Sequence, residues 1–328
     1  VSIASFEPRD APFPYNISWY MGKKENAFLV LAKRMSRNKN AMFGLTLFVI
    51  LVLAIIIVPI VSPYQYDKMD VMAIKQGPSS AHLFGTDDLG RDIFTRVFYG
   101  GRYSLSISIA AVLFSTAIGT VVGAIAGYFG GAADTVIMRL LDVSQAIPSM
   151  LLTIIISAAL GVGIDKTIIA IAVGTIPGNV RLLRGTVMQT RENQYLEAAE
   201  AIGCSTARRI MKYVIPNSWS PLIVSATMGV AKAILELAAL SYIGLGVQPP
   251  TPEWGAMLAG ARGFLRDYPY MLIFPGLFIA ISVLCLNMFG DGLRDALDPK
   301  LKDVIKVGRE AGLLAALLVD GAPLRVVG

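Results

Sequence analysis

The most constraining feature of the sequence is residues 41–61, a run without a single charged side chain. A helix rises ~1.5 Å per residue, so this run is long enough to cross ~30 Å of hydrocarbon. Lipid offers no partner to an open backbone N–H or C=O group, whereas a helix satisfies these groups internally. The run therefore predicts a membrane-spanning helix. Because it follows the polar residues 1–40, we expect a retained anchor and not a cleaved signal peptide.

Five further apolar blocks bring the predicted number of crossings to six. Pro148 lies inside one block and is expected to kink it, because proline lacks the N–H that a helix interior needs. Gly119, Gly123 and Gly127 repeat every four residues, a spacing that favours close packing on another membrane helix. The predicted fold class is an all-α integral membrane protein with six transmembrane helices. The five blocks cover about residues 103–128, 135–160, 167–187, 221–243 and 271–289.

The distribution of basic residues predicts the orientation in the membrane. The chain is 55% hydrophobic and 16% charged, which is more apolar than a typical soluble domain. Its net charge of +6 comes from basic residues before the first block, in residues 188–216 and after the last block. Cytoplasmic loops are rich in Lys and Arg, so we expect both termini and residues 188–216 in the cytoplasm and residues 62–102 and 244–270 outside. Clusters placed beside apolar blocks argue against nucleic acid as a partner.

The positions of the apolar blocks and of the basic clusters divide the chain into three parts. Phe28, Leu31 and Met35 recur at helical spacing near the N-terminus, which predicts a short helix lying on the membrane surface. A solvated basic leader that only sets the topology fits this segment equally well. The parts are a cytoplasmic segment (1–40), a six-helix transmembrane domain (41–302) and an unassigned tail (303–328).

Metal and nucleotide chemistry find little support in the sequence. His82 is the only histidine, and Cys204 and Cys285 lack metal-ligand spacing, so neither a metal site nor a disulfide framework is predicted. Residues 161–167 superficially resemble a phosphate-binding loop, but Asp165 replaces the glycine that must precede the lysine. We therefore expect this chain to bind no cofactor and to perform no chemistry.

Thr86, Asp87, Asp88 and Asp92 in the first external loop suggest a calcium loop only at first sight. The EF-hand order, with glycine sixth and glutamate twelfth, is absent from residues 86–92. Asp87 is instead expected to cap a helix over residues 89–98, with Arg91 as a local ion-pair partner. Trp254, in the second external loop, is expected at the membrane interface, where it touches a partner or seals a pathway mouth.

Residues 191–216 carry the most informative local pattern. Their first half is rich in alanine and favours a helix. Gly203 can then adopt the left-handed conformation that commonly ends a helix. Ser205 or Thr206 can cap a second, basic helix, and Pro216 is expected to end it as the chain returns to the membrane. The pattern predicts two short cytoplasmic helices joined by a glycine bend.

The first of these helices has the features of a docking element. Ala198 and Ala199 would give it a low-profile surface that enters a groove, and Glu197 and Glu200 would offer carboxylates to basic groups. The alternative is a solvated connector in which alanine only favours helix formation. The candidate docking set is Glu197, Ala198, Ala199, Glu200, Gly203, Arg208 and Pro216.

Lys232 and Glu236 are charged residues inside the fifth predicted span. A charge at the centre of a membrane helix costs ~2.5–3.5 kcal/mol on insertion scales, so neither side chain should face lipid. Their i,i+4 spacing allows them to pair on one helix face. They either line a solute pathway or only neutralise each other within the packed bundle.

The loop resembles a known family. Glu197-Ala198-Ala199, Gly203 and Pro216 match the EAA loop of ABC importer permeases, although Tyr213 and Ile215 stand where that family prefers Ile and Leu. Residues 82–92, 239–255 and 290–300 are similar to the C-type permease of dipeptide and oligopeptide importers. The resemblance covers roughly residues 25–302.

This resemblance implies a type I ABC importer permease fold in a prokaryotic cytoplasmic membrane. The docking element would be a coupling helix held by a cytoplasmic ATPase, with ATP and Mg bound by two such ATPase subunits. A homologous second permease, giving a heterodimer, and an extracytoplasmic solute-binding protein would complete the importer. The substrate would be a di- or oligopeptide, or alternatively nickel or another small solute.

A different class, an ion-gradient-driven carrier or channel, would need its own coupling-ion site near the midplane. Only Lys232 and Glu236 are available for one in this sequence. A membrane enzyme would need a nucleophile with its base or a metal cluster, and the sequence shows neither pattern.

Overall fold

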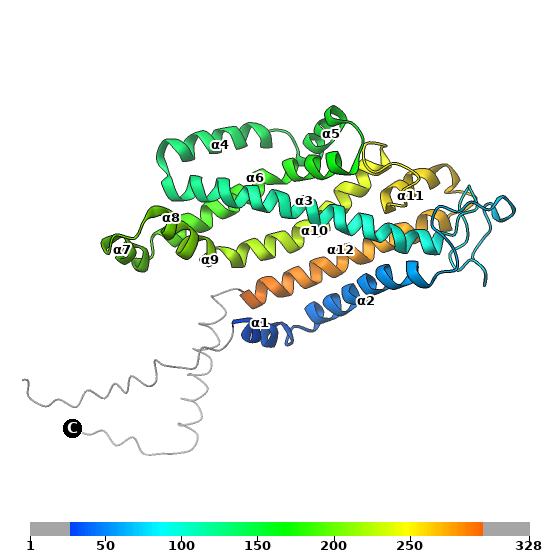
Figure 1. The fold of residues 1–328 in the computed structure, drawn as a ribbon, viewed down its shortest axis with the longest axis horizontal. Coiled ribbons are helices and arrows are strands. Elements are labelled where there is room, and N and C mark those ends of the chain that lie inside the picture. Colours follow the sequence, from blue (N-terminus) through cyan, green and yellow to red (C-terminus); the bar gives the residue numbers. More distant parts are fainter. Residues whose placement is uncertain (1–26, 298–328) are drawn as a thin grey trace, which may run out of the picture.

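The computed structural model describes residues 27–297, which form a bundle of long helices with shorter elements at both ends (Figure 1). Within these residues there is no β-strand, so the predicted all-α membrane class is confirmed. Five helices are long and apolar enough to cross a membrane, and a bent pair of helices makes a sixth crossing if it is counted as one span. The five are α2 (Lys39–Val61), α3 (Ile93–Phe129), α6 (Ile164–Arg191), α10 (Trp219–Tyr242) and α12 (Tyr270–Leu297).

Most of the shorter elements gather at the two ends of this bundle, whereas α4 and α5 lie along its side beside α3 and α6 (Figure 1). α7, α8 and α9 lie at the same end as α1, and α11 lies at the opposite end with the loop after α2 (Figure 1). The segments expected in the cytoplasm therefore share one end. The elements are α1 (Ala27–Met35), η2 (Val71–Ala73), α4 (Gly131–Gln145), α5 (Ser149–Leu160), α7 (Gln194–Ala201), α8 (Thr206–Arg209), the π-helical η3 (Ile210–Val214), α9 (Ile215–Asn217), α11 (Trp254–Ala261) and η4 (Arg262–Phe264).

The third predicted span is broken and not merely kinked. α4 ends at Gln145, α5 starts at Ser149, and the two helices meet at 85°. Pro148 stands at the break with ψ of 135°, an extended conformation. Proline cannot donate to the preceding turn and disfavours helical geometry in the residue before it, which explains why the chain leaves the helix here.

The second predicted span starts earlier than expected. α3 begins at Ile93 instead of near residue 103, because Asp92 and not Asp87 caps it: Oδ2 of Asp92 accepts from the Thr95 N–H at 2.8 Å. Asp87 Oδ1 accepts from the N–H groups of Leu89 and Arg91, each at 2.9 Å, and so closes a turn before the helix. The predicted helix over residues 89–98 is thus replaced by a turn followed by the start of α3.

The glycine strip on α3 packs against α6, as its spacing predicted. A Cβ atom placed on Gly123 would lie 2.8 Å from the Val180 carbonyl oxygen, and one on Gly119 would lie 2.6 Å from Cβ of Asn179. Gly127 meets Arg184 and Val187 in the same way. Only glycine permits this separation of the two helices.

Trp254 is an internal anchor between α11 and α3. Its side chain is fully buried, and its Nε1–H donates to the Val97 carbonyl of α3 at 2.8 Å. The indole therefore faces neither lipid headgroups nor a partner, while the position of its loop at the membrane interface stays a prediction. The neighbouring Glu253 is buried as well, where its carboxylate accepts from the N–H groups of Gly255 and Ala256 and from Ser104 Oγ at 2.9–3.0 Å.

The titration of Glu253 is expected to make the protein more stable in mild acid. Burial raises the pKa of this carboxyl group, against the opposing effect of its hydrogen bonds. A carboxyl group with a raised folded-state pKa contributes stability below its unfolded pKa, and this stability is lost as pH rises through the folded pKa. The thermal midpoint of wild type should therefore rise relative to that of Glu253→Gln as pH falls from about 8 toward about 4.3, the ordinary glutamate pKa. A difference that does not vary with pH would contradict this expectation.

The predicted N-terminal helix is present as α1. Its residues Leu31 and Met35 pack with Leu293 and Ala296 at the end of α12. This contact holds α1 against the bundle. The unassigned tail, residues 303–328, lies outside the described residues.

Candidate functional site

The predicted glycine bend is present between α7 and α8. The N–H of Gly203 donates to the Glu200 carbonyl at 2.9 Å, and the N–H of Cys204 donates to the Ala199 carbonyl at 3.0 Å. These two bonds form a Schellman motif, which requires a left-handed residue just after the helix. Gly203 fills that position with φ of +77°. The bend is therefore a defined turn.

Helix α7 turns one face toward the bundle. Leu196 packs with Leu183 and Val214. Ala199, three residues later on the helix, is also buried, while Ala198 is exposed. The expectation that both alanines share one outward surface needs correction. Neighbouring residues point about 100° apart around a helix, so Ala198 faces outward while Ala199 packs against the bundle.

The two glutamates of α7 also differ in their surroundings. Glu200 Oε2 lies 2.6 Å from Arg209 Nη1, so this carboxylate already pairs with the second half of the loop. The hydrogen bond to Glu200 raises the pKa of Arg209. Glu197 and Arg208 are exposed at the surface. The structure thus assigns Glu200 to holding the two halves of the loop together and leaves Glu197 facing outward.

Ile202 is a candidate docking residue that the sequence analysis missed. It is 84% exposed at the tip of α7, directly before the glycine bend. Its spacing of four from Ala198 places the two on the same helix face, whereas Leu196 and Ala199 define the buried face. That opposed spacing is the sequence signal that could have identified Ile202. An exposed apolar side chain at a projecting tip is typical of a contact surface.

The second half of the loop runs into α10 with less interruption than predicted. Pro216 lies inside α9 and does not end the helix, since only Ser218 separates α9 from α10. The π-helical turn η3 precedes this proline, and Ser218 Oγ donates to the Val214 carbonyl at 2.9 Å. Ser205 occupies the cap position of α8, although its side chain makes no capping hydrogen bond.

A cavity of about 650 Å³ lies between α3, α6, α10 and the break between α4 and α5. Its lining is mixed: hydroxyl, amide and ammonium side chains alternate with apolar ones, and apolar atoms make up the larger part of the exposed wall. It lies near the middle of α3 and α10, far from both ends of the bundle. The polar lining side chains are Ser115, Ser144, Gln145, Ser149, Thr175, Asn179, Ser225 and Lys232.

The two charged residues of α10 occupy different positions relative to this cavity. Lys232 lines it with a side chain that is 56% exposed, whereas Glu236 is 7% exposed and stands outside the lining. Lys232 Nζ lies 3.5 Å from Glu236 Oε1 and 3.4 Å from Ser149 Oγ. The predicted i,i+4 pair is therefore present, with its cationic member toward the open space.

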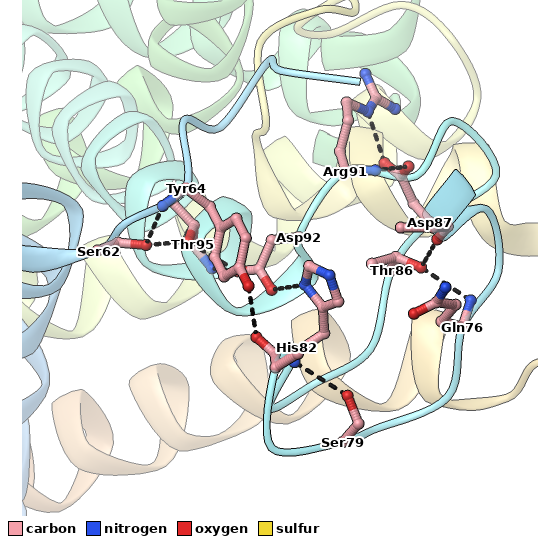
Figure 2. Close-up of polar contacts among 12 residues, drawn as sticks. Ser62, Tyr64, Gln76, Ser79, His82, Thr86, Asp87, Arg91, Asp92 and Thr95 are labelled. Carbon is pink, nitrogen blue, oxygen red and sulfur yellow. Dashed lines mark hydrogen bonds and ion pairs between the residues drawn. The ribbon is translucent and has the colours of Figure 1, made fainter. Parts of the chain in front are cut away.

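The loop after α2 is tied to α3 by a polar network (Figure 2). His82 Nδ1 lies 2.9 Å from Asp92 Oδ1, and the Tyr64 ring lies beside the imidazole, tilted by 34°, with 4.7 Å between ring centroids. Asp87 Oδ2 receives the Nε–H of Arg91 at 2.7 Å, as the predicted local ion pair requires. In the part of the chain that the structure describes, no group of three His, Cys, Asp or Glu residues could hold a metal ion. The acidic residues here cap α3 and fix the loop.

Known proteins share both the sequence and the arrangement of these elements. Residues 119–303 match the family "Binding-protein-dependent transport system inner membrane component", and residues 28–78 match "N-terminal TM domain of oligopeptide transport permease C". The dipeptide transport system permease protein DppC of Alkalihalophilus pseudofirmus is 46% identical over 270 residues, which cover 82% of this chain and 89% of the relative. The oligopeptide transport system permease protein OppC of Bacillus subtilis is 40% identical over 269 residues, covering 82% and 88%.

A solved structure shares the fold. The MetNI methionine ABC transporter, in an inward-facing conformation, matches 62% of this chain and 96% of its own chain with a TM-score of 0.51 and 17% identity. The family match spans more than half of this chain, and its relatives are membrane permease subunits and not enzymes. The chain therefore belongs to the family of binding-protein-dependent transport system inner membrane components, as a permease subunit of an ABC importer.

Proposed function

We propose that this permease passes di- or oligopeptides inward across a prokaryotic cytoplasmic membrane. The relatives are permeases of dipeptide and oligopeptide transport systems, which supports this substrate class. The cavity of about 650 Å³ offers room and polar contacts for a short peptide backbone. The observation that carries the proposal is α7, a short helix with a buried root and an exposed tip that projects from one end of the bundle (Figure 1).

The proposed role of α7 is to dock into an ATPase. Glu197, Ala198 and Ile202 would contact a groove on that subunit, with Arg208 at the edge of the contact. Leu196 would pass the movement to the bundle, because it packs with Leu183 of α6, Val214 before α10 and Ala124 of α3. Rigid helices that shift together would then alternate the access of the cavity between the two sides.

The proposal includes the remaining parts of the importer. Two cytoplasmic ATPase subunits would bind ATP and Mg, a homologous second permease would complete the pathway, and an extracytoplasmic binding protein would deliver the solute. Both termini of this chain and residues 188–216 would then lie in the cytoplasm. The shared end of α1 and α7 and the concentration of basic residues there support this orientation.

ATP-driven uptake of a dipeptide tests the proposal. The chain, purified with its partner subunits and reconstituted in liposomes with the binding protein, should accumulate labelled dialanine when ATP is present on the ATPase side. Omitting ATP or the binding protein should abolish accumulation. Uptake driven by an ion gradient and indifferent to ATP would contradict the proposal and favour a carrier, whereas ATP-driven uptake of nickel in place of peptide would correct only the substrate.

A further inference from the structure

The cavity between α3, α6 and α10 contains one charged side chain among its described lining residues, and that charge is positive. Lys232 reaches the cavity from the middle of α10, surrounded by hydroxyl and amide groups. We infer that the cavity includes a recognition site for a carboxylate, the free C-terminal group of a peptide, with Lys232 as its charged contact. This inference rests on the proposed import of peptides and names the part of the substrate that this chain reads.

The position of the Lys232 ammonium group suits this role. Its side chain lines the cavity and is 56% exposed. Among the described residues, its Nζ has polar contacts with Ser149 Oγ at 3.4 Å and Glu236 Oε1 at 3.5 Å, both long. An ammonium group has three N–H donors, so it retains capacity for a carboxylate oxygen. Glu236 is buried outside the cavity lining. It balances the charge of Lys232 within the protein without presenting a negative charge to the solute.

One amide group in the lining favours the same kind of ligand. The hydroxyl groups of Ser115 and Ser225 already donate to protein oxygens, at 3.1 and 3.5 Å. Asn179 Nδ2 donates one N–H to Ser115 Oγ at 3.1 Å and keeps its second N–H for a carboxylate oxygen. α5 also starts at the cavity with Ser149, and its cap residue Pro148 offers no side-chain acceptor to the first N–H groups. Helix N-termini carry a partial positive charge. The N-terminus of α5 therefore adds to the attraction that the Lys232 ammonium group exerts on a carboxylate. Lys232 remains the charged contact of the site.

Comparison of a peptide with its C-terminal amide tests the inference. Liposomes with the complete importer would be supplied with labelled dialanine or dialanine amide, each at a concentration that saturates the binding protein, whose affinity for each is measured separately. Wild type should transport the acid about tenfold faster than the amide, as expected for loss of a charge-assisted contact. If Lys232 had a purely structural role, replacing it would change the transport rates of acid and amide together and leave their ratio unaltered.

Matched variants separate recognition from charge balance. Lys232→Gln alone would leave Glu236 buried and unpaired, so the informative variant is the double Lys232→Gln/Glu236→Gln, which removes both charges. It should lower the acid-to-amide ratio to about one, a tenfold change by the same reasoning. Glu236→Gln and Lys232→Arg should keep the acid preference, since both retain a cation at position 232.

Each outcome decides between the two proposals. If wild type transports neither compound with ATP, the proposed function fails and not merely this site. If wild type transports dialanine but the double variant keeps the same acid preference, the carboxylate site is overturned. Should the double variant fail to assemble, wild type alone decides, because equal transport of acid and amide at saturation would overturn the inference and a clear acid preference would support it.

Discussion

Replacing Gly203 by proline is expected to abolish ATP-driven uptake while the permease still inserts into the membrane. Proline fixes φ near −65° and has no N–H, whereas Gly203 has φ of +77° and donates to the Glu200 carbonyl. The substitution therefore removes the Schellman turn and redirects the tip of α7. Uptake should fall at least about a hundredfold, since misplacement of a docking element uncouples the motor. Membrane abundance and the uptake rate are the two measurements.

The matched control is Gly203→Asn. Asparagine tolerates the left-handed conformation better than other non-glycine residues, and no atom lies within 4 Å of a Cβ added here. This variant should retain most of its uptake. If the proline variant also retained normal uptake, α7 would have no part in coupling. If the asparagine variant were equally inactive, the loss would come from the side chain and not from the turn.

A second large effect is expected for Gly123→Val in the seam between α3 and α6. The added Cβ would lie 2.8 Å from the Val180 carbonyl oxygen and 3.0 Å from Cβ of Leu183, and backbone atoms cannot swing aside as flexible side chains can. Overpacking of this kind costs ~1–3 kcal/mol or more. The thermal midpoint of the solubilised protein should fall by roughly 2–5 °C.

Gly185→Val provides the control for this substitution. Gly185 lies on α6, the helix against which Gly123 of α3 packs. Nothing lies within 4 Å of a Cβ placed on Gly185. Valine has a somewhat better helix propensity than glycine, so the midpoint should stay level or rise slightly. Equal losses in both variants would mean that valine is tolerated poorly anywhere in these helices and that the close approach of α3 and α6 contributes little.

Features that depend on one local stretch were predictable from the sequence. The crossings follow from the length of apolar blocks, and the bend at Gly203 follows from a residue that suits a left-handed turn. The close packing of α3 on α6 follows in the same way from a spacing of four, because that spacing places small residues on one helix face.

Features that depend on which of several equivalent residues is used were not predictable. Asp87 and Asp92 are both suited to capping, and only the fold of the loop after α2 selects Asp92. Glu197 and Glu200 look alike in sequence, yet Arg209 approaches only Glu200 among the two. The cavity could not be foreseen for a related reason. Its wall is assembled from helices far apart in the chain, and the 85° turn near Pro148 exceeds what a proline alone dictates.

Helix α3 is long enough to reach from one set of contacts to the other. At ~1.5 Å per residue its 37 residues extend about 55 Å, well beyond the thickness of the hydrocarbon layer. Its Ala124 belongs to the cluster under α7, and its first residues are clamped to the loop that holds His82. If α7 is the docking element that we propose, a tilt of α3 imposed beside α7 would move the loop at the opposite end of the bundle through one continuous helix, without a relay of side chains. Movements at the two ends would then occur together.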